Sequence, residues 1–247
     1  MKTKMTFIGS GSAFVDRKKN YQSNVLLSKN DKNLLIDCGS DARHALKDLG
    51  YSPMDIDAVF ITHLHADHIG SLEWLAFCTH FNPNKEKPQM FLRDEEFALQ
   101  LWGSLKGGLR SLQFKEPTLE TFFDVIYTGE KFVWENIPFD AIQTIHTMDN
   151  NSYNPSYGLK FILNDKTVFF SGDTQFAPNQ YIEILHSVDL VFHDCETSPF
   201  ESGVHSYYRK MLEVPKDIKE KTWLYHYDDK PFVAEEENFA GCYVYSS

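Results

Sequence analysis

The run HLHADH at residues 63–68 places three imidazoles and one carboxylate within six residues, directly after an apolar segment. Zinc and similar metals are bound by imidazole nitrogen and carboxylate oxygen, and a site with one position open to water can generate hydroxide near neutral pH. His63 and His65 are two residues apart on an extended segment, so they point to the same side and can share one metal. Asp67 and His68 follow where the chain turns toward a helix, and they can serve a second ion. The run therefore predicts a metal site.

Three further candidate ligands each follow a segment that reads as a strand. They are His146, Asp173 in the stretch Gly172-Asp173-Thr174, and His226 in WLYH. Strand ends can deliver such side chains to a common edge. A dinuclear site needs about seven protein ligands if a water bridges the two ions. The residues that supply this number are His63, His65, Asp67, His68, His146, Asp173 and His226.

The elements that must position these residues alternate along the chain. The strands expected from apolar and β-branched runs are 5–9, 24–37 as a hairpin with a turn at 30–33, 58–62, 89–92, 122–127, 131–134, 137–146, 157–163, 167–171, 189–193 and 222–226. The helices expected from amphipathic spacing are 41–49, 67–80, 94–102, 178–187 and 205–213. Residues 103–120 give no clear pattern. No repeat or linker divides the chain, so we expect one domain over residues 1–247.

Composition limits the classes of protein that this chain can be. The 247 residues are 42% hydrophobic with no apolar run near 20 residues, and the N-terminus lacks the apolar core of a signal peptide. We therefore expect no membrane span and a cytoplasmic protein, in the host cytoplasm if a phage encodes it. The four cysteines are far apart, which indicates neither a disulfide framework nor a thiolate zinc site. A net charge of −11 opposes a stable nucleic-acid partner but not a small anionic substrate.

The motifs also resemble a known family. HLHADH followed by a single His, Asp and His at long intervals is similar to the metallo-β-lactamase superfamily of metallohydrolases. The stretches FIGSGSAF, NYQSNVLL and LLIDCGSDAR look most like the branch of RNase Z and its phosphodiesterase relatives, and the resemblance spans nearly the whole chain. It implies an α/β fold of the αββα type, in which two mixed β-sheets lie face to face, helices flank them, and metals bind at one edge.

The resemblance also implies a role for each ligand. His63, His65 and His146 would hold one zinc ion, Asp67, His68 and His226 would hold the other, and Asp173 would bridge them. Manganese or iron can occupy similar sites. In the same family an aspartate that matches Asp37 supports the metal loop without binding metal; a helix-capping or turn aspartate is the alternative.

Residues 193–206 resemble the segment where RNase Z-like enzymes keep an acidic residue and a histidine near the scissile bond. We assign these roles to Asp194 and His205, although His193 or Glu196 could take part instead. In the resulting mechanism, a hydroxide held by the ions and oriented by Asp67 attacks phosphorus. His205, positioned by Asp194, protonates the departing ribose oxygen.

The expected substrate class depends on a feature of RNase Z that this chain lacks. RNase Z uses a long protruding arm to grip tRNA, and neither 70–146 nor 174–226 reads as such an arm. In length and armless organisation the chain looks similar to RNase Z-like cyclic nucleotide phosphodiesterases, including phage and bacterial anti-Pycsar proteins that degrade cyclic nucleotide immune signals. This implies hydrolysis of 3′,5′-cyclic mononucleotides. The sequence does not indicate the preferred base or ring size.

Those relatives act as homodimers, and residues 74–115, with Trp74, Phe77, Trp102 and Arg110, could form the contact; core packing is the alternative. Three other functions remain open. They are tRNA 3′-processing by an RNase Z-type endoribonuclease, hydrolysis of another small substrate such as a thioester or lactone, and a non-catalytic module that retained the fold.

Overall fold

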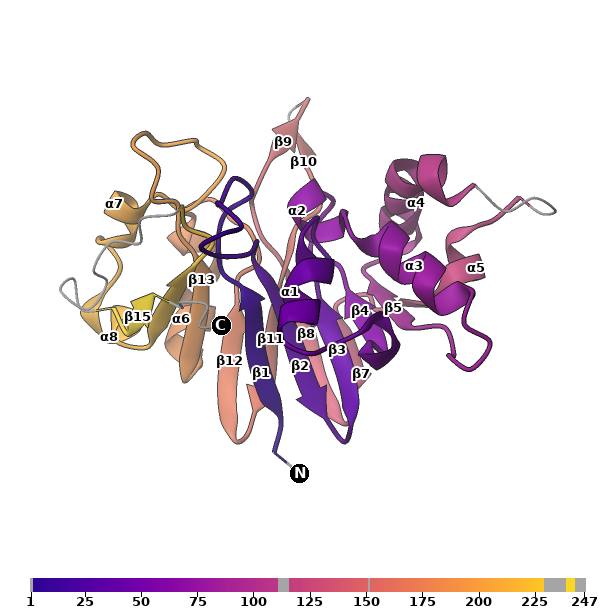
Figure 1. The fold of residues 1–247 in the computed structure, drawn as a ribbon. Coiled ribbons are helices and arrows are strands. Elements are labelled where there is room, and N and C mark those ends of the chain that lie inside the picture. Colours follow the sequence, from indigo (N-terminus) through magenta and orange to yellow (C-terminus); the bar gives the residue numbers. More distant parts are fainter. Residues whose placement is uncertain (1, 111–115, 151, 229–238, 243–247) are drawn as a thin grey trace.

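Two large mixed sheets form the centre of the protein in the computed structural model, which describes residues 2–110, 116–150, 152–228 and 239–242 (Figure 1). The first sheet has the strand order β1-β2-β3-β4-β5-β6, and the second has the order β15-β14-β13-β12-β11-β8-β7. The strands of the first sheet are β1 (Lys4–Gly9), β2 (Asn24–Lys29), β3 (Lys32–Ile36), β4 (Ala58–Phe60), β5 (Gln89–Leu92) and β6 (Asp124–Tyr127). Those of the second are β7 (Lys131–Trp134), β8 (Ile137–Gln143), β11 (Tyr157–Leu163), β12 (Lys166–Phe170), β13 (Leu190–Asp194), β14 (Thr222–Tyr225) and β15 (Gly241–Cys242).

Helices cover the outer face of each sheet. The helices of the first half are α1 (Ala42–Asp48), α2 (Ala66–Ile69), α3 (Leu72–His80), α4 (Glu95–Leu109) and α5 (Leu119–Phe122), with a 3-10 turn at Pro53–Asp55. Those of the second half are α6 (Pro178–Ser187), α7 (Tyr208–Met211) and α8 (Lys216–Lys219). Figure 1 shows the two groups on opposite sides of the paired sheets. The expected αββα arrangement is confirmed.

Side-chain alternation explains this layering, because successive strand residues point to opposite faces. On β2, Leu26 belongs to the apolar cluster under the first group of helices, whereas Val25 and Leu27 belong to the cluster between the two sheets. On β12, Phe169 packs with the helices of the second half, while Val168 and Phe170 lie between the sheets. Each sheet therefore has two buried faces, and the inter-sheet cluster fixes how the two halves meet.

Because many strands run in the same direction, their carboxyl ends lie at the same edge of the sheets. In the first sheet β3, β4, β5 and β6 are parallel, and in the second β12, β13, β14 and β15 are parallel. β8 is antiparallel to β11, which is antiparallel to β12, so β8 and β12 run in the same direction. The carboxyl ends of β4, β8, β12, β13 and β14 are the points after which the candidate site residues occur.

Four predicted elements differ most from those in the structure. The helix predicted over 94–102 continues through three glycines to Leu109, because Leu101, Leu105 and Leu109 recur every four residues on a buried face. The helix predicted over 67–80 is two helices, since the Ser71 N–H donates to the Cys38 carbonyl at 2.9 Å rather than continuing the helical ladder. The strand predicted over 137–146 ends at Gln143.

The helix predicted over 205–213 is confined to α7. Residues before it stay extended, because the Glu196 N–H donates to the Ser206 carbonyl at 2.9 Å and the Tyr208 N–H donates to the Glu196 carbonyl at 3.0 Å. Sequence reasoning also missed six short elements, which are the 3-10 turn, α5, α8, β15 and the two strands of a hairpin, β9 (Met148–Asp149) and β10 (Ser152–Tyr153).

The segment expected to contribute to a dimer packs within the chain. Trp74, Phe77 and Trp102 are partly buried against the first apolar cluster, and the Arg110 guanidinium donates to Glu116 at 2.7 Å. Residues 111–115 of that segment lie outside the described residues. In the described part of the chain, none of the helices is long and apolar enough to cross a membrane.

Candidate metal centre

The HLHADH run leaves the end of β4 and enters α2, and Asp37 holds this turn from the neighbouring strand β3. One Asp37 carboxylate oxygen accepts the Thr62 N–H at 2.8 Å, and the other accepts the Thr62 hydroxyl at 2.7 Å. His68 Nδ1 lies 2.7 Å from the same second oxygen. An ionised carboxylate only accepts hydrogen bonds, so His68 carries a proton on Nδ1, and Nε2 is the nitrogen that can bind a metal ion. Asp37 thus makes the contacts of a residue that supports the metal loop.

One group of ligand atoms comes from His63, His65 and His146, which lie within 4.8 Å of one another. His146 Nδ1 donates to the Val204 carbonyl at 2.7 Å, which leaves Nε2 as an acceptor. That Nε2 lies only 3.1 Å from Nδ1 of His65. Burial lowers the pKa of His146 to about 4 and lowers the pKa of His65 and of His63. At this distance the two imidazole nitrogens can share either a proton or a metal ion, and neutral imidazoles are the form that binds metal.

A second group comprises Asp67, His68, Asp173 and His226, whose ligand atoms also lie within 4.8 Å. Asp173 stands at its centre. Its Oδ2 lies 3.2 Å from His68 Nε2 and 3.2 Å from His226 Nε2, and it also lies 3.8 Å from His63 Nε2 of the first group. The Asp67 Oδ2 lies 3.1 Å from His68 Nε2 and 3.4 Å from His226 Nε2. The Asp173 carboxylate therefore lies between the two groups, where a bridging ligand would be needed.

Several buried polar atoms of this cluster support the assignment to metal. His63 Nε2, His68 Nε2 and both carboxylate oxygens of Asp173 are buried and have no hydrogen-bond partner among the residues that the structure describes. A buried polar atom without a partner is costly unless another group satisfies it. Unpartnered imidazole nitrogens and carboxylate oxygens that converge form the donor set that divalent metals prefer. The residues present therefore fit metal ions.

The pKa values of the second group show a strongly negative centre. Burial opposes charge on Asp173, but the His226 and His68 imidazoles outweigh it and hold the pKa of this carboxyl well below its usual range. Burial likewise opposes charge on His68, yet the Asp173, Asp67 and Asp37 carboxylates raise its pKa well above the usual value. The carboxylates of Asp173, Asp67 and Asp37 thus favour a positive charge beside His68.

Asp194, the last residue of β13, lies beside the metal-ligand groups. Its Oδ2 is 2.9 Å from His205 Nδ1 and accepts the Thr174 N–H at 2.9 Å, while its Oδ1 is 3.6 Å from His226 Nδ1. Burial lowers the pKa of His205, but the Asp194 carboxylate outweighs it and raises that pKa to about 9. One buried carboxylate thus faces both His205 and the candidate ligand His226.

His193 and Glu196, the alternatives to Asp194 and His205, make contacts that stabilise the surrounding structure. Successive strand residues face opposite ways, so His193 points away from Asp194 and the site: its Nε2 lies 3.2 Å from the Tyr181 hydroxyl, under α6. The Glu196 carboxylate accepts the Ser202 N–H at 2.9 Å and the Ser198 hydroxyl at 2.9 Å. Glu196 therefore shapes the loop that leads to His205.

A cavity of about 380 Å³ adjoins the cluster. His205 and His226 form part of its wall, and the loops after β1 and β13 form most of the rest. Ligand pockets of roughly 300–1,000 Å³ are typical for small molecules. Sequence reasoning did not identify this cavity or the contact of Thr62 with Asp37, because neither follows a ligand-type motif.

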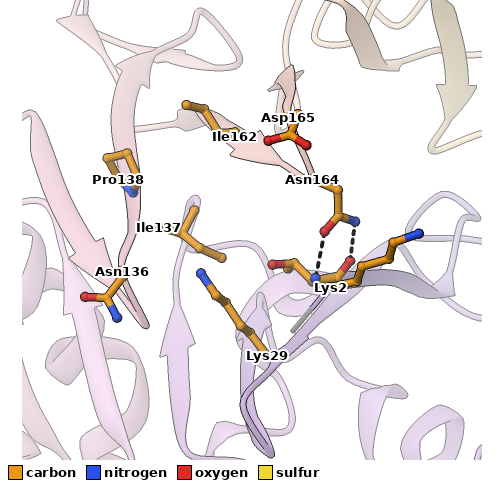
Figure 2. Close-up of a pocket in the computed structure, with 9 residues that line it drawn as sticks. Lys2, Lys29, Asn136, Ile137, Pro138, Ile162, Asn164 and Asp165 are labelled. Atoms are coloured by element: carbon orange, nitrogen blue, oxygen red, sulfur yellow. Dashed lines mark hydrogen bonds between the residues drawn. The ribbon is translucent and has the colours of Figure 1, made fainter.

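Another cavity, of about 600 Å³, lies at the opposite ends of the strands (Figure 2). Figure 2 shows Lys2, Lys29 and the Asn164 amide, which donates to the Thr3 carbonyl at 2.7 Å and accepts the Thr3 N–H at 2.8 Å. None of the candidate metal ligands belongs to its described lining. The metal centre and the 380 Å³ cavity therefore form the candidate active site.

Solved structures with similar backbones confirm the fold. The metallo-β-lactamase fold protein YhfI from Bacillus subtilis superposes with a TM-score of 0.74 at 20% identity, covering 98% of this chain and 95% of that one. The short form of human tRNase Z gives a TM-score of 0.66 at 19% identity, covering 91% of this chain and 93% of that one. At these identities the likeness shows the metallo-β-lactamase fold and no more.

Sequence comparison shows the family. The model of the family described as anti-Pycsar protein Apyc1 matches residues 3–243. An anti-Pycsar protein Apyc1 of Paenibacillus harenae is 36% identical over 228 residues, 90% of this chain and 88% of that protein. One from Bacillus phage vB_BsuM-Goe3 is 36% identical over 241 residues, 92% of this chain and 90% of that protein. The chain therefore belongs to the anti-Pycsar Apyc1 family.

Proposed function

We propose that this protein is a dinuclear metal phosphodiesterase that hydrolyses 3′,5′-cyclic mononucleotides. The observation that supports it best is the position of His205. This side chain is held by Asp194 at 2.9 Å, lies beside the second ligand group, and forms part of the wall of the cavity. Cleavage of a small phosphodiester requires a proton donor between a metal centre and a cavity for the substrate.

Seven residues would hold the two ions. His63, His65 and His146 would bind one, Asp67, His68 and His226 the other, and the Asp173 carboxylate would bridge them. Zinc fits this nitrogen-rich set, and manganese or iron has similar preferences. When bound, the two ions would supply Lewis acidity toward a phosphoryl oxygen and lower the pKa of a water.

The chain's own groups would orient the water and protonate the leaving oxygen. As the oxygen of water, oriented by the Asp67 carboxylate, forms its bond to phosphorus, that water gives its proton to solvent. The bond between phosphorus and one ribose oxygen breaks, and His205 gives its proton to that oxygen. Asp194 holds the protonated His205 ring in place, and the raised pKa of about 9 means that this ring carries a proton at neutral pH. The product is a linear nucleoside monophosphate.

The biological role that we propose is removal of cyclic nucleotide immune signals, as the name of the family suggests. We also propose that the protein acts as a homodimer, which mass determination in solution at several protein concentrations tests directly. A mass equal to one chain of 28.6 kDa at all concentrations would contradict this second point without affecting the first.

Turnover by the purified, zinc-loaded protein tests the proposed function. The substrates are a panel of 3′,5′-cyclic mononucleotides, cyclic dinucleotides and a tRNA precursor. We expect hydrolysis of cyclic mononucleotides that stops after chelation and returns when metal is added back.

Two variants serve as controls. Asp67→Ala removes a proposed ligand and the group that orients the attacking water, and we expect it to abolish turnover while the circular dichroism spectrum stays unchanged. Asp57→Asn changes an aspartate at the opposite end of β4, where it pairs with Lys32 and Lys85 at 3.1 and 3.2 Å, and should retain full activity. Cleavage of the tRNA alone, or an Asp67→Ala variant with most of its activity, would contradict the proposal.

A further inference from the structure

Two phenylalanines with unusual exposure line the cavity beside the metal centre. Phe14 is 94% exposed and Phe200 is 73% exposed, although both are large apolar side chains. They come from different loops, after β1 and after β13, yet they border the same cavity as His205 and His226. Exposed aromatic side chains that gather at a concave site indicate a surface for a ligand.

The loop that carries Phe14 is tied to the segment after the candidate ligand His226. The Ser12 N–H donates to the Tyr227 carbonyl at 2.9 Å, and the Ser12 hydroxyl donates to the Asp228 carboxylate at 2.9 Å. The Phe14 N–H in turn donates to the Ser12 hydroxyl at 3.2 Å. The backbone at Phe14 is therefore held at a set position relative to the metal centre.

The loop that carries Phe200 is tied to the segment after Asp194. The Glu196 carboxylate accepts the Ser202 N–H at 2.9 Å, and the Ser198 hydroxyl lies within hydrogen-bond reach of both the Glu196 carboxylate and the Phe200 carbonyl. Glu196 lies two residues beyond Asp194, which holds His205. The two loops that carry these aromatic side chains are thus anchored through residues next to the chemical groups, as loops that position a substrate must be.

We infer that Phe14 and Phe200 bind the nucleobase of the substrate by stacking, while the metal centre and His205 bind its phosphate. This inference rests on the proposed function and assigns the two residues that position the substrate. Stacking accepts every base, because each base has a π-face, and removal of one stacking aromatic side chain costs about 1–3 kcal/mol. That cost corresponds to a loss of about 5-fold to 150-fold in affinity.

The test compares two substrates that share the reacting group and differ in the base. One is a 3′,5′-cyclic mononucleotide, and the other is the abasic ribose 3′,5′-cyclic phosphate. For Phe14→Ala and Phe200→Ala we expect kcat/KM for the nucleotide to fall about 5-fold to 150-fold, mainly through KM, while kcat/KM for the abasic compound stays within about twofold. Phe14→Trp should retain the activity of the parent. Phe81→Ala, which removes a 66% exposed phenylalanine at the end of α3, is the matched control and should change neither.

Equal losses with both substrates would overturn the inference, because they would show that the loops act only on the structure of the site. No loss with either substrate would overturn it as well. If the parent hydrolyses neither compound, the proposed function fails, and binding of a nucleoside 5′-monophosphate by calorimetry then decides the inference. Weaker binding by both alanine variants but not by Phe81→Ala would support it, and unchanged binding would refute it.

Discussion

Replacing Asp37 by Asn tests the structural basis of the metal centre without touching a proposed ligand. The carboxylate of Asp37 receives three hydrogen bonds, two from Thr62 and one from Nδ1 of His68. An asparagine offers one oxygen and one NH₂ group, so if its oxygen continues to accept the Thr62 N–H, its NH₂ group faces His68 Nδ1. Two donors cannot pair, and His68 must move its proton to Nε2, the atom that faces Asp67 and Asp173.

The expected magnitude follows from this change of tautomer. A ligand nitrogen that carries a proton cannot bind metal, and loss of a supporting partner of this kind typically lowers metal affinity about 10-fold to 100-fold. That range corresponds to about 1.4–2.7 kcal/mol of binding free energy. The fold should persist, because the substitution leaves the backbone pairing intact: the N–H of residue 37 still donates to the Phe60 carbonyl.

Competition between the protein and a chromophoric chelator measures the zinc affinity. The matched control is Asp57→Asn, at the other end of β4, whose carboxylate accepts from Lys32 and Lys85 instead of a histidine. We expect the control to bind zinc like the parent. An Asp37→Asn variant that is folded and binds zinc as tightly as the parent would refute the reasoning, because it would show that Asp37 does not set the His68 tautomer.

Three further predictions concern the same site. His205→Gln should lower kcat about 10²-fold to 10⁴-fold with unchanged zinc content, and equal activity would exclude His205 as the proton donor. Gly39→Ala should weaken zinc binding, since its Cβ would lie 1.8 Å from the Asp67 carbonyl oxygen, and unchanged affinity in a zinc titration would contradict this. Gly103→Ala, at an exposed position of α4, should instead stabilise the protein by about 1 kcal/mol, and a loss of stability in urea unfolding would contradict this. Chelation should lower Tm by about 8–16 °C relative to protein with free zinc at about 1,000 times its Kd, as thermal unfolding would show.

The candidate ligands were predictable because their types and positions are local in the sequence. Four of them occupy six residues, and Asp173 and His226 each come within three residues of the end of a strand. The alternation of apolar residues also predicted most strands. The carboxyl ends of parallel strands meet at one edge, so ligand-type residues that follow several strands indicate a shared site from the order of the elements alone.

Other features depend on contacts between distant segments and could not be read from local patterns. The predicted end of the helix at 102 was wrong, because glycines usually end a helix and the buried leucine row that extends it to Leu109 is visible only against the sheet. The roles of His193 and Asp194 could not be separated in the sequence. Their register on β13 decides that His193 faces Tyr181 and that Asp194 faces His205.

The two halves of the protein contribute unequal parts of one site. The first sheet delivers His63, His65, Asp67 and His68 on a single turn held by Asp37, and the second delivers His146, Asp173 and His226 from three separate strand ends. The Asp173 oxygen, 3.8 Å from His63 and 3.2 Å from His68, is where the two contributions meet. Because that meeting depends on the apolar cluster between the sheets, the geometry of the centre is a property of inter-sheet packing as well as of its ligands.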